Sequence, residues 1–279
     1  MFSNRRKQPK NTSNYLALSV PTIVTDRDVD YKVDGNTARL TMNRPEVLNA
    51  LSNGMFRCLE TAIRDAAKDP AVHVVVISGA GRAFSAGLDV RQVSGFASRT
   101  EAHDFVYKLV LPFWKQFLAC EKPVIAAVDG PAYGAGAEIA LASDIVVAST
   151  RSTFAFSGGK VGALCCISAG FGQQTIIGRK VVEMNLTGSA MNAEEARMFG
   201  LVNYVEDQAV LNDRVNKIAE EIRHVSPTSN SSFKRIRRTT FTPRVLAAAH
   251  KELLRTITSP DFKKGAEAFK QKARPEFYS

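Results

Sequence analysis

Two glycine-containing stretches decide the fold class: GAGRAFSAGLDV at residues 79–90 and DGPAYGAGAEIALASD at residues 129–144. Each follows a short run of β-branched and small apolar residues and leads into a helical pattern, so each is predicted to be a strand-to-helix turn. Glycine suits such turns because it adopts a positive φ without steric cost. Strands that are repeatedly followed by helices predict an α/β fold.

The same alternation extends outward from these two stretches. Buried strands are predicted at residues 37–43, 72–78, 123–130 and 144–150, because these runs are rich in β-branched residues. Apolar residues spaced by three and four predict amphipathic helices between them. Only helices are predicted after Val205. The chain is therefore divided into a basic tail predicted to be disordered (1–30), an α/β core (31–205) and a helical region (206–279).

Composition excludes several classes of protein. The chain has 279 residues, 45% of them hydrophobic, and a formal net charge of +10. No apolar run approaches the roughly 18 residues that a membrane span needs, so no membrane segment is predicted. The four cysteines have no paired spacing, which indicates a reducing compartment and no disulfide framework. No metal site is predicted.

The first 25 residues carry Arg5, Arg6, Lys7 and Lys10 and no acidic residue. This composition predicts a solvated tail of a cytoplasmic protein. A basic, acid-poor N-terminus is also typical of a mitochondrial transit peptide, so the mitochondrial matrix is the alternative location.

Four further motifs connect the two glycine stretches to a known family. They are NRPEVLNAL (43–51), KPVIAAVDG (122–130), LTGSAMNAEEARMFGLVNYV (186–205) and FKQKARPEF (269–277). In this order they resemble the crotonase superfamily, the enoyl-CoA hydratase/isomerase family, over residues 31–277. The resemblance implies a spiral of ββα turns with a C-terminal helical oligomerisation region, assembled as a trimer or hexamer. The helical tail must bury its apolar face, and a neighbouring subunit is expected to cover it.

The resemblance also implies the chemistry of the site. The backbone amides of Leu88 and Ala135 correspond to the oxyanion hole that receives the thioester oxygen of an acyl-CoA substrate. Backbone donors suit this role because they are fixed before the charge develops. Glu138, in the first turn of the following helix, corresponds to the family's first catalytic glutamate and is interpreted as the general acid/base.

Other residues are assigned to CoA, which is part of the substrate, and no permanently bound cofactor is expected. The resemblance places Glu46, Val47 and Ala50 along the adenosine side and assigns Ala86, Asp89 and Val90 to the same binding groove. Asp89 is also predicted to cap a helix. Lys272 matches a terminal lysine that meets CoA phosphate from a neighbouring subunit. The positive net charge suits a polyphosphate ligand.

The sequence departs from the hydratase pattern at Gly158, which stands where hydratases carry a second glutamate. Two carboxylates divide the proton transfers of hydration, so the loss of one makes a reaction with a single base more attractive. Three chemistries stay open: a shift of a double bond from 3-enoyl to 2-enoyl thioester, decarboxylation, and hydration with Lys160, Ser157 or Cys165 as the replacement group.

Two remote alternatives have other functions. The basic run KRIRR (234–238) suggests RNA binding as an alternative function. It lies on a predicted helix without interleaved aromatic residues, which favours a solvated helix face. A catalytically silent family member is the other alternative. The presence of Glu138 and of both glycine-containing loops argues against it.

Overall fold

The computed structural model describes residues 24–26, 28–172, 177–239 and 242–277, and its described strands form two sheets. The larger sheet has the order β1 (Val24–Asp26), β2 (Val29–Asp34), β3 (Thr37–Met42), β4 (Val74–Gly79), β5 (Val124–Val128), β7 (Ile145–Ser149) and β10 (Tyr204–Glu206). The smaller sheet has the order β6 (Pro131–Tyr133), β8 (Thr153–Ala155) and β9 (Ala190–Asn192). Strands β3, β4, β5, β7 and β10 run parallel, so the α/β prediction is confirmed.

Helices connect and cover the parallel strands. In chain order they are α1 (Asn53–Lys68), α2 (Val90–Val93), α3 (Arg99–Phe105), α4 (Leu111–Ala119), α5 (Ala135–Ala142), α6 (Cys166–Gly170), α7 (Gly178–Thr187) and α8 (Ala193–Met198), then α9 (Leu211–Arg223), α10 (Pro227–Arg238), α11 (Pro243–Ile257) and α12 (Pro260–Lys270). Two short helices, η1 (Pro45–Val47) and η3 (Ser157–Val161), contribute residues to the cavity described below. Serine or threonine side chains cap α1, α3, α10, α11 and α12.

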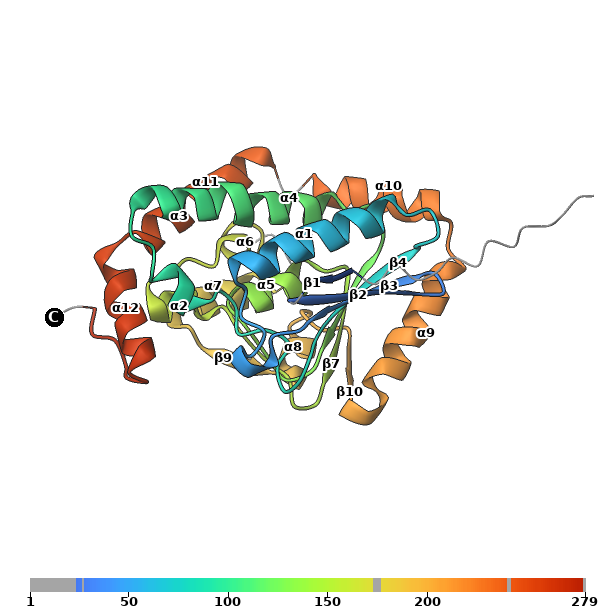
Figure 1. Ribbon diagram of the computed structural model, residues 1–279. Coiled ribbons are helices and arrows are strands. Elements are labelled where there is room, and N and C mark those ends of the chain that lie inside the picture. Colours follow the sequence, from blue (N-terminus) through green and yellow to red (C-terminus); the bar gives the residue numbers. More distant parts are fainter. Residues whose placement is uncertain (1–23, 27, 173–176, 240–241, 278–279) are drawn as a thin grey trace, which may run out of the picture.

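The larger sheet is a layer between two sets of helices, and the pleat decides which side chain faces which set. In β4, Val75 and Ile77 belong to the main core, which also contains residues of α1 and α4. The alternate residues Val74 and Val76 pack with α9 on the other face. Figure 1 shows α1 and α9 on different sides of the strands. This two-sided burial explains why β4 has a continuous apolar sequence.

The helical segment after β4 is interrupted by a π-helical turn, η2 (Val106–Val110). Pro112 follows in the first turn of α4 and has no N–H to donate to an i−4 carbonyl. The freed backbone is accommodated by the wider turn. Residues of this region, Val110 and Trp114, face the cavity described below.

Three of the four C-terminal helices bury their apolar faces within their own chain. Helix α9 packs on the sheet, α11 contributes to the main core, and α12 packs on η3. The expectation that this tail needs a neighbouring subunit to cover it is therefore wrong for α9, α11 and α12. Helix α10 differs, because none of its described residues is buried and Phe233 and Ile236 are exposed.

The boundary predicted at the start of the core is also corrected. Strands β1 and β2 begin at Val24 and Val29, inside the range that was assigned to the tail. Strand β2 pairs with β3 along its whole length, which makes it part of the sheet. The rest of the predicted tail, residues 1–23, lies outside the described residues.

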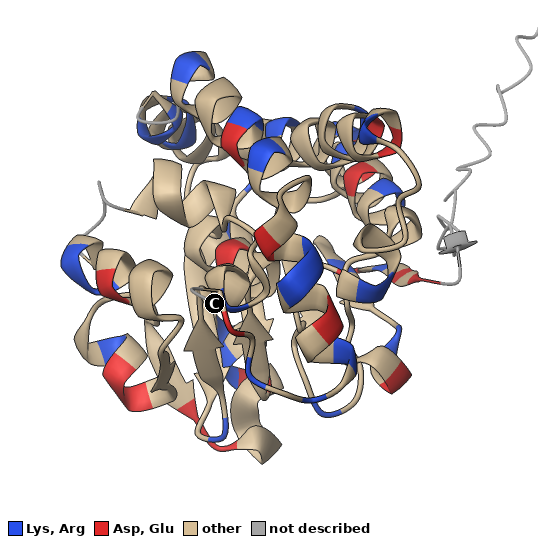
Figure 2. Ribbon diagram, turned by 90° about the vertical axis from the view of Figure 1, so that its left-hand side faces the viewer, with Lys and Arg blue, Asp and Glu red and all other residues tan. Residues whose placement is uncertain are grey.

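The basic run at residues 234–238 is not the free helix face that its composition suggests. Lys234 and Arg237 both form ion pairs with Asp144, and Arg235 pairs with Glu121. These contacts fasten α10 to the end of α5 and leave fewer cations for an outside ligand. Figure 2 shows basic and acidic residues interspersed over the helices. No helix in the described ranges is long and apolar enough to cross a membrane.

Candidate active site

The residues predicted to form the site line one cavity of about 670 Å³. It opens between the segment 43–51, the loop after β4, the start of α5, the segment 157–166 and helix α12. All ten predicted residues lie on its wall, namely Glu46, Val47, Ala50, Ala86, Leu88, Asp89, Val90, Ala135, Glu138 and Lys272. The fold thus brings together residues that are up to 226 positions apart in the sequence, from Glu46 to Lys272.

The two glycine-containing loops contact each other directly. Gly87 has a φ of +89°, and a Cβ atom there would lie 2.6 Å from the Tyr133 carbonyl oxygen and 3.1 Å from the Ala135 amide nitrogen. A Cβ atom at Gly136 would lie 2.5 Å from the Ser85 carbonyl oxygen. Side chains at either position would push the loops apart, so glycine is required for their close approach.

The amide groups of Leu88 and Ala135 are left without acceptors where the loops meet. Leu51 donates to the Gly87 carbonyl (2.7 Å) and accepts from the Asp89 amide (3.1 Å), so these bonds flank Leu88. In a parallel bridge the flanked residue turns its own N–H to the other side. Ala135 is the first residue of α5, where no intrahelical acceptor exists. Within the described residues neither amide has a hydrogen-bond partner, which leaves two donors at the cavity.

Glu138 is buried one helical turn after Ala135, with an exposed fraction of 2%. Its Oε1 accepts hydrogen bonds from the amides of Ile167 (2.7 Å) and Ser168 (2.9 Å), at the start of α6. Burial raises the pKa of this carboxyl group to about 7, although the two amides act in the opposite direction. A fixed carboxyl group with a pKa near neutrality can both accept and return a proton.

There is no room for a side chain at Gly158, the position where the resemblance predicts that hydratases carry a second glutamate. A Cβ atom there would lie 2.6 Å from the Ala163 carbonyl oxygen and 3.0 Å from Cys165 Sγ. The Ala163 amide also donates to the Gly158 carbonyl oxygen (2.9 Å). Backbone atoms of this chain therefore occupy the place that a side chain at position 158 would need.

The three groups suggested as replacements are placed differently. Ser157 and Cys165 line the cavity, whereas Lys160 does not and instead packs against Gly188. Burial raises the pKa of the Cys165 thiol well above its ordinary value, and the charge of Glu138 adds to this effect. Cys165 is therefore a neutral thiol at physiological pH.

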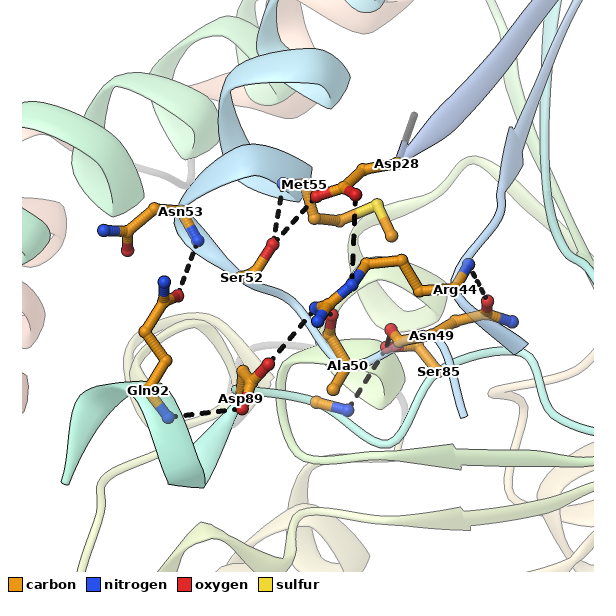
Figure 3. A network of polar contacts seen from close by, with 11 residues as sticks. Asp28, Arg44, Asn49, Ala50, Ser52, Asn53, Met55, Ser85, Asp89 and Gln92 are labelled. Atoms are coloured by element: carbon orange, nitrogen blue, oxygen red, sulfur yellow. Dashed lines mark hydrogen bonds and ion pairs between the residues drawn. The ribbon is translucent and has the colours of Figure 1, made fainter. Parts of the chain in front are cut away.

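A network of hydrogen bonds beneath the loop that follows β4 was not predicted from the sequence (Figure 3). Asn49 is fully buried, and its Nδ2 donates to the carbonyl oxygens of Ala80 (2.9 Å) and Ala83 (2.8 Å). Ser85 Oγ donates to the Asn49 carbonyl oxygen (2.8 Å) and accepts from the Gly87 amide (3.2 Å). This network fixes the backbone that carries the Leu88 amide.

Arg44 ties a second part of the network to the same loop. Its Nη1 donates to the Ala50 carbonyl oxygen (2.8 Å) and to Asp89 Oδ2 (3.2 Å), and its Nε lies 3.9 Å from Asp28 Oδ1. Asp89 caps α2 through the Gln92 amide, as predicted. Figure 3 shows the guanidinium between Asp28 and Asp89. Both Arg44 and Asn49 belong to the NRPEVLNAL motif, which is the feature of the sequence that could have indicated them.

We expect Asn49→Ala to lower the free energy of unfolding by roughly 2–4 kcal/mol, because two buried carbonyl oxygens lose their donors. Asn53→Ala is the matched control, since Asn53 Oδ1 has no hydrogen-bond partner, and we expect it to stay within about 0.5 kcal/mol of the wild type. Urea denaturation followed by circular dichroism measures both. Equal effects of the two substitutions would contradict the structural role of Asn49.

Apolar side chains form the inner part of the cavity and were also missed by the sequence reasoning. Phe56, Val110, Trp114, Leu164, Leu253 and Phe262 line it and are contributed by five separate segments of the chain. Helical periodicity predicted that such residues are buried but could not indicate which of them border a cavity. The inner cavity can hold an apolar chain.

Charged residues of both signs line the cavity, with three cations beside the acidic residues Glu46 and Asp89. Arg82, Arg91 and Lys272 line it, and all three are exposed. The resemblance implied that Lys272 comes from a neighbouring subunit, but here it lines the cavity of its own chain because α12 folds back onto η3. Among the described residues no cluster of side chains could hold a metal ion.

An α/β spiral in which two strand-to-helix loops meet beside a buried glutamate defines a protein of the crotonase class. Comparison with known proteins agrees. The sequence profile of the family described as Enoyl-CoA hydratase/isomerase matches residues 32–279. The chain belongs to this family and is an enzyme of the enoyl-CoA hydratase/isomerase type.

Individual relatives are similar over most of their length. Mitochondrial enoyl-CoA hydratase of Pongo abelii is 30% identical over 245 residues, which are 85% of this chain and 82% of the relative. (E)-benzylidenesuccinyl-CoA hydratase of Thauera aromatica is 34% identical over 212 residues, covering 74% of this chain and 80% of the relative. The crystal structure of an enoyl-CoA hydratase/isomerase from Pseudoalteromonas atlantica T6c has a TM-score of 0.80 and 27% identity, covering 90% of this chain and 100% of that chain.

Proposed function

We propose that this enzyme holds the enolate of an acyl-CoA thioester between the amides of Leu88 and Ala135 and moves protons with Glu138. One observation carries the proposal: two amides without acceptors and a buried carboxyl group share one cavity. Such donors stabilise charge that appears only as the enolate forms, and this differential binding accelerates proton removal. The CoA thioesters in the names of the relatives support the same class of substrate.

Within this class, the geometry favours the shift of a double bond from a 3-enoyl to a 2-enoyl thioester. Glu138 as carboxylate removes a proton from C2, and the electron pair of that bond moves into the thioester carbonyl. The two amides receive the developing negative charge on the oxygen. Glu138, now protonated, returns the proton to C4, and the double bond forms between C2 and C3. The reaction needs one carboxylate, which matches the closed backbone at Gly158.

Hydration of a 2-enoyl thioester is the second candidate, because relatives are named as hydratases. It would need another group to activate water. Ser157 and Cys165 line the cavity. A neutral hydroxyl or thiol group is, however, a weaker base than a carboxylate. Decarboxylation of a malonyl- or glutaconyl-type thioester uses the same two amides and is the third chemistry.

Incubation with 2-enoyl-, 3-enoyl- and carboxyacyl-CoA panels in D₂O tests these assignments. We expect 3-enoyl-CoA to give 2-enoyl-CoA, with any deuterium at C4, as identified by NMR and mass spectrometry. A 3-hydroxyacyl product would show that hydration is the reaction, and loss of CO₂ would show decarboxylation. Absence of turnover with all three panels would overturn the proposed function.

The pH dependence follows from the role of Glu138 as a base. Its pKa of about 7 means that the reactive carboxylate is a minor form below neutrality. We therefore expect kcat/KM for 3-enoyl-CoA to rise about tenfold per pH unit below pH 7 and to level off above it. A coupled spectrophotometric assay between pH 5.5 and 9 measures the profile. A rate that falls as the pH rises through 7 would instead mean that the protonated form is required.

CoA is proposed to lie along Glu46, Val47, Ala50, Ala86, Asp89 and Val90, with its phosphates near Lys272. No permanent cofactor is proposed.

The exposed Phe233 and Ile236 of α10 support a homo-oligomer, and we propose a trimer or hexamer.

Relatives from Pongo abelii and Dictyostelium discoideum are named as mitochondrial, so we propose the mitochondrial matrix as the location of this enzyme. The prediction of a cytoplasmic location has no support.

A further inference from the structure

A second cavity, of about 490 Å³, lies next to the active-site cavity, between α12 and the segment that leads from α2 into α3. Its floor is apolar and buried, formed by Val93, Ala102, Ile257 and Ala266. Its mouth is exposed and carries Arg99, Lys263 and Lys270. The proposed proton transfers do not use this space.

Phe262 separates the two cavities. Of the described residues that border either cavity, Phe262 alone borders both. Its exposed fraction is 4%, so the residue is buried where it borders the two cavities. On the active-site side it faces the same cavity as Trp114 and Leu253, in the apolar part.

The backbone that carries Phe262 is held in place by two glycines. A Cβ atom at Gly162 would lie 2.6 Å from the Phe262 amide nitrogen, and one at Gly265 would lie 2.5 Å from the Val161 carbonyl carbon. Helix α12 therefore sits directly on the backbone of η3. The Phe262 amide is also capped by Ser259 Oγ (3.2 Å). With so little room to shift, the backbone at Phe262 has a defined position.

We propose that Phe262 is the specificity-determining wall that limits the length of the acyl chain. This inference rests on the proposed function, because it takes acyl-CoA as the ligand. Acyl chains that fit in front of Phe262 are bound, and longer chains are excluded from the second cavity. Each CH₂ group that enters apolar surroundings tightens the dissociation constant roughly fourfold. The wall should therefore appear as a break in the dependence of affinity on chain length.

The test measures Kd by isothermal titration calorimetry for saturated acyl-CoAs from butyryl- to palmitoyl-CoA, which bind without reacting. For the wild type we expect Kd to tighten with chain length and then stop improving. For Phe262→Ala the improvement should continue with chain length, giving at least about tenfold tighter binding of the longest chains than the wild type. Phe262→Leu, which removes less volume, should shift the break in the same direction and serves if the alanine variant does not fold.

Phe96→Ala is the matched control, because Phe96 borders only the second cavity. It should keep the wild-type dependence on chain length. The proposed role of Phe262 would be overturned if Kd depended on chain length identically in the wild type and both Phe262 variants. An equal shift of the break in Phe96→Ala would overturn it as well. Acyl-CoA binding without isomerisation would sink only the proposed reaction, whereas a wild type that binds no acyl-CoA would sink both.

Discussion

Glu138→Gln is expected to lower kcat by about 10⁴-fold with little change in KM. General base catalysis contributes roughly 10²- to 10⁴-fold, and the upper end applies because no side chain can stand at Gly158 to share the work. The glutamine oxygen can still accept from the Ile167 and Ser168 amides, so the site keeps its shape. Steady-state kinetics with 3-enoyl-CoA measure the effect.

Two controls separate chemistry from folding in this variant. Glu101→Gln changes another first-turn glutamate, on α3 and outside the cavity, and should leave kcat unchanged. Because burial raises the folded-state pKa of Glu138 from 4.5 to about 7, the carboxyl group favours folding when protonated, and this advantage is lost as the pH rises from 4.5 to about 7. At pH 8 the glutamine variant should therefore be more stable, by on the order of 3 kcal/mol. Substantial remaining activity in a folded Glu138→Gln protein would exclude Glu138 as the base.

Ala135→Pro is expected to lower kcat/KM by roughly 10²- to 10³-fold, the loss that follows removal of one oxyanion donor. Ala135 is the first residue of α5, where proline is compatible with the helix and removes only an amide that has no intrahelical acceptor. The proline ring also occupies part of the space in front of the amide, so the measured loss is an upper bound on the contribution of the Ala135 N–H donor. Kinetics with the same 3-enoyl-CoA give the value.

Ala193→Pro is the matched control for this variant. Ala193 is likewise a buried alanine at the first position of a helix, α8, after the capping residue Asn192, and it lies outside the active-site cavity. We expect near wild-type kinetics from it. If both proline variants lose activity equally, or if Ala135→Pro stays fully active while folded, the Ala135 amide is not the oxyanion donor.

The features that sequence alone predicted are those whose physical requirements are local. A glycine at positive φ and the apolar strand before it can be predicted from about a dozen consecutive residues. The turns around Gly87 and Gly134 were therefore recognised. The role of Glu138 came from the family resemblance, in which it corresponds to the first catalytic glutamate. The family resemblance then supplied roles, and the structure places every assigned residue at one cavity.

The features that sequence missed depend on contacts between distant segments. Asn49 binds carbonyl groups more than thirty residues away, and the NRPEVLNAL motif to which it belongs does not show which groups its side chain contacts. The periodicity of α12 predicted an apolar face but not that Phe262 would meet η3 of the same chain. For the same reason, the composition of residues 234–238 suggested a solvated face, although Asp144 was available in the folded chain.

The attachment of Glu138 to the start of α6 has a consequence for stereochemistry. In the proposed isomerisation Oε2 of Glu138 exchanges protons with the substrate, because the amides of Ile167 and Ser168 both hold Oε1. A single oxygen atom at a fixed position reaches one face of a planar dienolate. The hydrogen taken from C2 and the hydrogen given to C4 should therefore lie on the same side, making the allylic rearrangement suprafacial and selective for one of the two prochiral C2 hydrogens.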